Sequence, residues 1–286
     1  MRIILSYIDR NEYPVNQVLE AFMIKKTSFT IEKIYLDCID DQGNCFIIYW
    51  AKAAFFFMKF VYSGLIFCDA EGFTTEKSTL RRTKKPVVDG TIQFNHKYLK
   101  AGVSLKRTDD PITMSLYKDS ENKVLKWNCH HPKALAEIIY KGNIHKGFGY
   151  AETLISSIKP WNLPIDELRW GRFLSDSYTL IWINWKGKYS INKIFFNGIE
   201  YDDAIFGNDN VIFGEGIYQL KFSEIQLIRK GRLSGLFSKM TLLKILFDRR
   251  ILNTEEIKYK AKTTLGKKSD FLSNGWSLFE IVTWGK

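Results

Sequence analysis

The feature that most constrains this chain is a long succession of short runs in which apolar and polar residues alternate, separated by turn signals. One such run has a clean period of two and puts four side chains on one face of a strand: Phe56, Met58, Phe60 and Tyr62. Asn197-Gly198, a strong hairpin turn, lies between two further runs. Many short strands at this spacing predict an all-β protein built as a sandwich or a barrel. The aromatic face is expected to look into a core or a cavity.

Helical signals are few, and the best are Pro14–Lys25 and Leu236–Leu246. A faint internal repeat is visible, because two widely separated segments each read as an aromatic strand, a polar turn and a second aromatic strand. These segments are Ile34–Asp37 with Phe46–Trp50, and Arg169–Phe173 with Leu180–Trp185. The repeat predicts two similar antiparallel β domains side by side, residues 1–160 and 161–286, joined near Pro160–Pro164.

Three segments allow more than one interpretation. Phe46–Phe67 is long enough to span a bilayer, but Lys52 and Lys59 would each cost about 2.5–3.5 kcal/mol near its centre, so two successive strands are favoured. Ala134–Tyr140 fits a short helix or a strand, and the Gly142-Asn143 turn that follows favours a hairpin. The basic stretch Glu76–Pro86 fits a solvated loop or, alternatively, a patch that gates a substrate or touches a membrane.

Composition narrows the class of protein. Of 286 residues, 45% are hydrophobic and 15% aromatic, which is enough to bury a core. The net charge of +11 would suit an anionic partner, but Lys and Arg are dispersed and no nucleic-acid-binding motif is present, so no nucleic acid is expected. The four cysteines form no CxxC pair, although Cys38 and Cys45 flank a turn. We expect reduced thiols in a cytoplasmic protein, and no metal site.

The densest constellation of functional residue types lies in the middle of the chain. On a strand, Phe148, Tyr150 and Glu152 share one face, and Trp170 and Arg172 share a face of the next strand. A structural interpretation is an aromatic core with one buried Glu–Arg pair. The functional interpretation is a carboxylic acid in an apolar pocket, where desolvation raises its pKa and keeps it protonated as a proton donor.

The same segments resemble a known family. The motifs GFGYAE (147–152), PWNLP (160–164), LRWGRF (168–173) and WINWKG (182–187) are similar to those of the carotenoid 1,2-hydratase (hydroxyneurosporene synthase) family and its lipocalin-like relatives. Trp127–Ala134, Glu255–Tyr259 and Gly275–Trp284 also look like family segments, so the resemblance covers roughly residues 30–286. The hydratases carry a Gly-Tyr-His-Asp stretch where this chain has Gly149-Tyr150-Ala151-Glu152.

The resemblance implies two lipocalin-like β domains, few helices and no metal or organic cofactor. It implies a hydratase that protonates an alkene of an isoprenoid or polyene, with Glu152 as the donor. Tyr150, Trp170 and Trp161 would stabilise the carbocation, while Arg172 would position Glu152 or Glu280. Phe148 and the face that begins at Phe56 would bind the lipophilic substrate. A carrier without activity and a polyene cyclase remain alternatives, as does peripheral association with a membrane.

Overall fold

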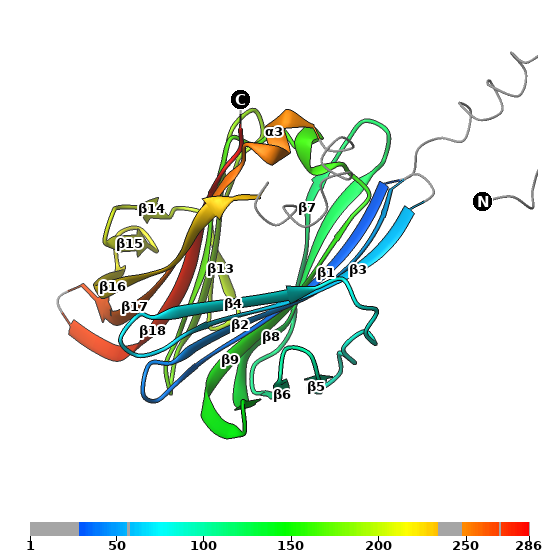
Figure 1. Ribbon diagram of the computed structural model, residues 1–286. Helices are drawn as coiled ribbons and strands as arrows, with labels where there is room; N and C mark the ends of the chain where they lie inside the picture. Colours follow the sequence, from blue (N-terminus) through cyan, green and yellow to red (C-terminus); the bar gives the residue numbers. More distant parts are fainter. Residues whose placement is uncertain (1–28, 56–57, 234–247, 269, 286) are drawn as a thin grey trace, which may run out of the picture.

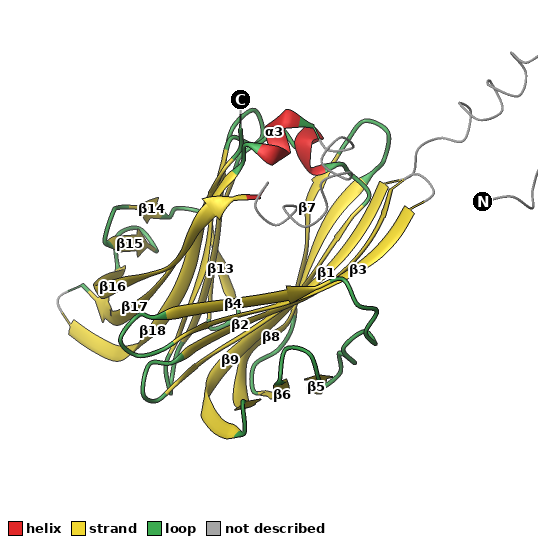
Figure 2. Cartoon of the chain, viewed as in Figure 1, coloured by secondary structure: helices red, strands yellow, loops and turns green. Residues whose placement is uncertain are grey.

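The computed structural model describes residues 29–55, 58–233, 248–268 and 270–285 of the chain. Most of these residues lie in strands and very few are helical, as Figure 2 shows, which confirms the all-β prediction. The predicted helices Pro14–Lys25 and Leu236–Leu246, and the predicted site residue Phe56, lie outside the described residues. None of the helices described is long and apolar enough to cross a membrane.

The first sheet is antiparallel and contains nine strands in the order β4-β3-β2-β1-β9-β8-β6-β5, with β7 also paired to β8. The strands of the first sheet are β1 (Phe29–Asp40), β2 (Cys45–Phe55), β3 (Met58–Cys68), β4 (Thr74–Thr79), β5 (Thr91–His96), β6 (Ala101–Arg107), β7 (Ile112–Lys118), β8 (Val124–Tyr140) and β9 (Asn143–Ser156). The segment Phe46–Phe67 thus contains parts of the two successive strands that the sequence predicts, and Ala134–Tyr140 lies within a strand rather than a helix. The predicted loop Glu76–Pro86 is wrong in its first part, because Glu76–Thr79 pairs with β3.

The second sheet repeats this plan with the order β13-β12-β11-β10-β18-β17-β16-β15-β14. Its strands are β10 (Glu167–Leu174), β11 (Thr179–Lys186), β12 (Ile191–Phe196), β13 (Ile199–Tyr201), β14 (Ile205–Phe206), β15 (Asn210–Phe213), β16 (Tyr218–Arg232), β17 (Glu255–Lys267) and β18 (Asp270–Thr283). In both sheets the first strand pairs with the second strand and with the last one. Asn197-Gly198 makes the predicted hairpin turn between β12 and β13, with positive φ at both residues.

Each sheet curls around a core of its own, and the outer faces of the two sheets pack together in a third core. Strand β1 shows the alternation that makes this possible: Leu36 faces the core of the first sheet, whereas Tyr35 and Ile39 face the second sheet. Figure 1 shows the two curled sheets, the first coloured blue to green and the second light green to red, with the short helix α3 (Arg249–Leu252) at one end. All four cysteines are buried free thiols, so no disulfide links Cys38 to Cys45.

Candidate functional site

A cavity of about 390 Å³ lies between the two sheets. Its walls come from both sheets and are mostly aliphatic or aromatic, as in most small-molecule sites. On two neighbouring strands the lining ends close to one level: on β1 it ends at Lys33, one step before Tyr35, and on β9 it ends at Glu152, which lies across from Tyr35. The cavity is therefore bounded at one end by a row of polar and aromatic side chains.

That row has one half on each sheet. On the first sheet, Tyr35 lies directly across from Tyr49 on β2 and from Glu152 on β9. On the second sheet, Glu280 of β18 lies across from Trp170 of β10 and from Lys258 of β17. The halves touch, because the Trp170 ring centroid is 5.2 Å from that of Tyr35 and the Lys258 ammonium is 5.8 Å from that of Tyr49. We call these six residues the floor of the cavity.

Glu152 is the buried acid of the floor. Trp127 Nε1 and Tyr150 Oη donate hydrogen bonds to the same oxygen, Glu152 Oε2, over 2.5 and 2.6 Å. Glu152 Oε1 accepts no hydrogen bond from the described residues, so it is the oxygen that can carry a proton toward the cavity. Burial raises the pKa of Glu152 above its ordinary 4.5, although Lys33 and the two hydrogen bonds oppose the shift. Glu152 thus combines a raised pKa with a position in the lining of a mostly apolar cavity.

A charged network occupies the other half of the floor. Lys258 is buried between Glu280 and Glu256, and Arg229 bonds Glu256 over 2.6 Å and Glu76 over 3.3 Å. Burial lowers the pKa of Lys258 to about 8, against the opposing charge of Glu256. Burial alone would raise the pKa of Glu256, but the charges of Lys258 and Arg229 outweigh burial and lower it. Glu256 is therefore an ionised partner of two cations and not a proton donor.

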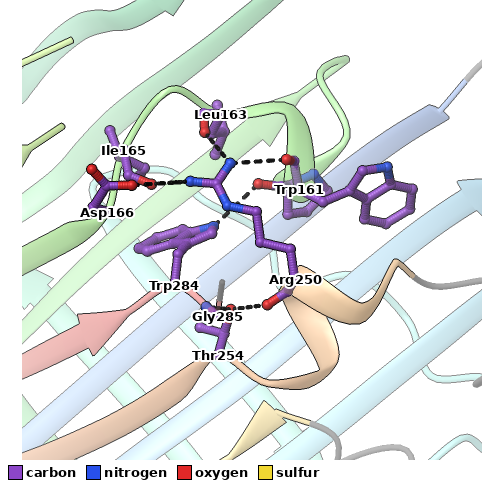
Figure 3. Close-up of polar contacts among 9 residues, drawn as sticks. Trp161, Leu163, Ile165, Asp166, Arg250, Thr254, Trp284 and Gly285 are labelled. Atoms are coloured by element: carbon purple, nitrogen blue, oxygen red, sulfur yellow. Dashed lines mark hydrogen bonds and ion pairs between the residues drawn. The ribbon is translucent and has the colours of Figure 1, made fainter. Parts of the chain in front are cut away.

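The opposite end of the cavity is lined by the connection between the sheets and by α3. Arg250 of α3 donates hydrogen bonds from its guanidinium to the carbonyl oxygens of Trp161, Leu163 and Ile165, at 3.0, 2.8 and 2.6 Å (Figure 3). Trp284 Nε1 donates to the next carbonyl in this segment, that of Pro160. A single planar group thus fixes several carbonyls of an irregular segment. We call this end of the cavity the cap.

The predicted role of Arg172 is wrong. Its guanidinium is fully buried and bonds Asp37 Oδ1 from Nε and Nη2, at 3.0 and 2.5 Å, so it contacts neither Glu152 nor Glu280. The reason is topological: β9 and β10 belong to different sheets, and the strand that faces Arg172 is β1. Glu280 instead pairs with Lys258, its cross-strand neighbour. The structure thus contains a buried carboxylate–Arg pair between the sheets, with Asp37 in place of Glu152.

The remaining predicted residues divide into two groups. Trp170, Phe60 and Tyr62 line the cavity, so part of the predicted aromatic face does look into it. Phe148 and Tyr150 belong to the core between the sheets and lie outside the lining. Met58 is outside the lining too, and Trp161 stands at the cap, where its ring packs on Phe29 and Phe55. Tyr150 therefore acts on Glu152 through its hydroxyl, and its ring does not reach the cavity.

Several residues of the site carried no signal in the sequence. Lys33, Arg229 and Lys258 stand in alternating strands, where a charged residue normally marks the solvated face. The side of the strands that carries these three residues is buried only because the outer faces of the two sheets pack together. Trp127 could have been found, since it opens Trp127–Ala134, a segment noted above for its resemblance to the hydratases. Within the ranges described, no group of three His, Cys, Asp or Glu side chains is placed to hold a metal ion.

Comparison with known proteins shows the fold. No family model matches the chain, and no curated protein matches its sequence. Solved structures do match: an AttH-like protein of Nitrosomonas europaea has a TM-score of 0.54 at 9% identity, over 98% of this chain and 99% of that one. Kievitone hydratase of Nectria haematococca has a TM-score of 0.53 at 9% identity, over 90% and 89%. CghA in complex with Sch210972 has a TM-score of 0.51 at 9% identity, with the same coverage. The chain shares the two-sheet, lipocalin-like fold of these proteins.

Proposed function

We propose that the protein is a hydratase-like enzyme that adds water to an alkene of an apolar isoprenoid or polyene, such as a carotenoid-type chain, without a metal or organic cofactor. The observation that carries the proposal is the position of Glu152: a carboxyl group with a raised pKa, in a cavity with apolar walls. One of the structures with this fold is named as a hydratase. The cavity volume is in the usual range for a small-molecule site.

The chemistry would proceed in two balanced steps. The protonated Oε1 of Glu152 delivers its proton to one alkene carbon, and the other carbon becomes a tertiary carbocation. The π face of Trp170, which borders the same cavity, stabilises that cation. Water then attacks the cation and returns a proton to the Glu152 carboxylate. The hydrogen bonds from Trp127 and Tyr150 stabilise the carboxylate between the steps.

The test is turnover of the full chain with a panel of isoprenoids and carotenoid-type polyenes in isotopically labelled water, with product mass as the readout. The wild type is expected to add one labelled water. Glu152→Gln keeps an acceptor for both donors but cannot deliver a proton, so turnover should fall by about 10²–10⁴-fold or more while the melting temperature and ligand binding change little. Unchanged turnover in this variant would eliminate the mechanism.

The same experiment separates the two alternatives. Binding without conversion would indicate a carrier of lipophilic ligands. Conversion without incorporation of labelled oxygen would indicate a cyclase. Either result would overturn the hydratase proposal.

A further inference from the structure

Lys33 is a cation in the cavity that lacks a contacting anion. It lies on β1 one step above the floor and lines the cavity. Its Nζ is 5.9 Å from the ring centroid of Tyr35 and 5.5 Å from that of Tyr49. Among the residues that the structure describes, no carboxylate forms an ion pair with it and no acceptor takes a hydrogen bond from it. Lys33 is partly buried, and the contacts of its ammonium group are with the faces of these two rings, so it has no anionic partner among the described residues.

The carboxylates around Lys33 are already engaged. Glu256 and Glu280 contact Lys258, and Glu76 contacts Arg229. Glu152, the remaining acid of the floor, is the proton donor in the proposed function and is neutral when it acts. Coulomb energy falls with distance. An anionic ligand oxygen in contact with Lys33 would therefore be attracted to the ammonium more strongly than it is repelled by the more distant carboxylates, which already contact other cations.

Other unsatisfied groups around the cavity point the same way. Tyr49 Oη, Trp170 Nε1 and Trp185 Nε1 are buried without a hydrogen-bond partner among the described residues, and all three residues line the cavity. Each of these groups can donate a hydrogen bond, and two of them can only donate. Tyr49 and Trp170 belong to the floor, whereas Trp185 lies across from Leu168, one step nearer the cap. The cavity therefore offers an excess of donors at its floor and next to it, and most of its other lining residues are apolar.

We infer that the ligand is an amphiphile with an acidic oxygen head, a carboxylate or an enolate, which binds Lys33 while the apolar part extends toward the cap. This inference rests on the proposed function for the site and narrows its substrate class. A plain hydrocarbon polyene would leave the ammonium and the donors without partners.

The test compares two probes with the same polyene chain, all-trans-retinoic acid and retinol, by quenching of tryptophan fluorescence in the full chain. The wild type is expected to bind the acid about tenfold or more tightly than the alcohol. Lys33→Met should weaken binding of the acid roughly 10- to 100-fold, the range for one lost hydrogen bond to a charged group, and leave retinol nearly unchanged. Lys33→Arg should retain the preference. Lys126→Met, an exposed lysine on β8, is the matched control.

Equal binding of the two probes by the wild type would overturn the inference, as would an equal loss of both in Lys33→Met. Either result leaves the role of Glu152 intact, because that role is read from turnover. Failure of both probes to bind the folded wild type would count against a ligand cavity altogether, and so against the proposed function as well.

Discussion

Glu152 is subject to contacts that act on its proton in opposite directions. Burial favours the neutral acid, whereas the hydrogen bonds from Trp127 and Tyr150 and the charge of Lys33 favour the carboxylate. Burial wins, and the pKa is raised. The two hydrogen bonds end on one oxygen, so the neutral form can keep both of them. Glu152 is thus held in place in either protonation state.

The raised pKa of Glu152 has a consequence for stability. Between pH 4.5, the ordinary pKa, and the raised value, the folded protein binds more protons than the unfolded chain. The contribution of this carboxyl group to stability is therefore complete below pH 4.5 and is lost as the pH rises through the raised pKa. We expect the free energy of unfolding of the wild type, relative to Glu152→Gln, to fall as the pH rises from acid to neutral.

Urea denaturation of both proteins across a series of buffers measures this difference. Glu71→Gln, at an exposed turn, is the control and should follow the wild type. A difference between the wild type and Glu152→Gln that does not vary with pH would show that Glu152 has an ordinary pKa.

The residue scale is where prediction from the sequence was least complete. The strand period placed Phe148, Tyr150 and Glu152 on one face, and the structure places all three at the boundary between the sheets. The partner of Arg172 could not be found in this way. Asp37 lies far from it in the sequence and meets it only because two outer faces pack together. No periodicity along one strand encodes that contact.

At the scale of elements, the Asp37–Arg172 pair joins β1 of the first sheet to β10 of the second. Arg172 Nη1 also donates to the carbonyl of Trp276. Burial alone would lower the pKa of Arg172, but the charge and hydrogen bonds of Asp37 outweigh it and raise that pKa. Burial raises the pKa of Asp37, against the opposing charge and hydrogen bonds of Arg172. Two N–H groups of Arg172 bind Asp37 Oδ1, and this geometry favours the ionised form of the pair. Removal of one member leaves the other as an uncompensated buried charge.

We therefore expect Arg172→Met to reduce the free energy of unfolding by about 3–5 kcal/mol, measured by urea denaturation. The double variant Asp37→Leu/Arg172→Met should recover much of that loss, since it buries no lone charge. As a control, Lys193→Met breaks an exposed pair with Glu200 and should cost about 1 kcal/mol or less. A loss in Arg172→Met no larger than in Lys193→Met would show that the pair does not stabilise the contact between the sheets.

Most of the elements themselves were predictable. Period-two runs and turn residues located the hairpins of β2 with β3, of β8 with β9 and of β12 with β13. The glycines of the GFGYAE motif have a structural explanation: a Cβ on Gly149 would lie 2.7 Å from the carbonyl oxygen of Asp37 and 2.8 Å from Leu105. Strand order is not readable in this way, because β1 with β9 and β10 with β18 pair over long separations.

At the scale of the whole molecule, the two sheets share one topology and a common core. The core between them includes Tyr35, Trp127 and Tyr150 of the first sheet together with Trp170 and Leu278 of the second. The faint repeat seen in the sequence falls on the matching hairpins β1–β2 and β10–β11. The division into two domains, residues 1–160 and 161–286, remains a proposal. The core between the sheets contains residues of both of these parts.

We expect the chain to unfold in a single cooperative transition, because separating the sheets would expose the largest aromatic cluster to water. Tryptophan fluorescence reports on the core between the sheets, and far-ultraviolet circular dichroism reports on the strands. The two curves should coincide in urea. Two resolved transitions, with fluorescence changing before the loss of β structure, would show that the sheets separate first and are stable alone.

The pairing of β10 with β18 has a further consequence during protein synthesis. Strand β10 lacks one of its two neighbours until β18, the last strand of the second sheet in chain order, has been synthesised. All strands of the first sheet precede β10 in the chain, so the first sheet can form earlier. For that interval the nascent chain presents the outer aromatic face of the first sheet with no completed partner to cover it. Such a face is a binding site for chaperones.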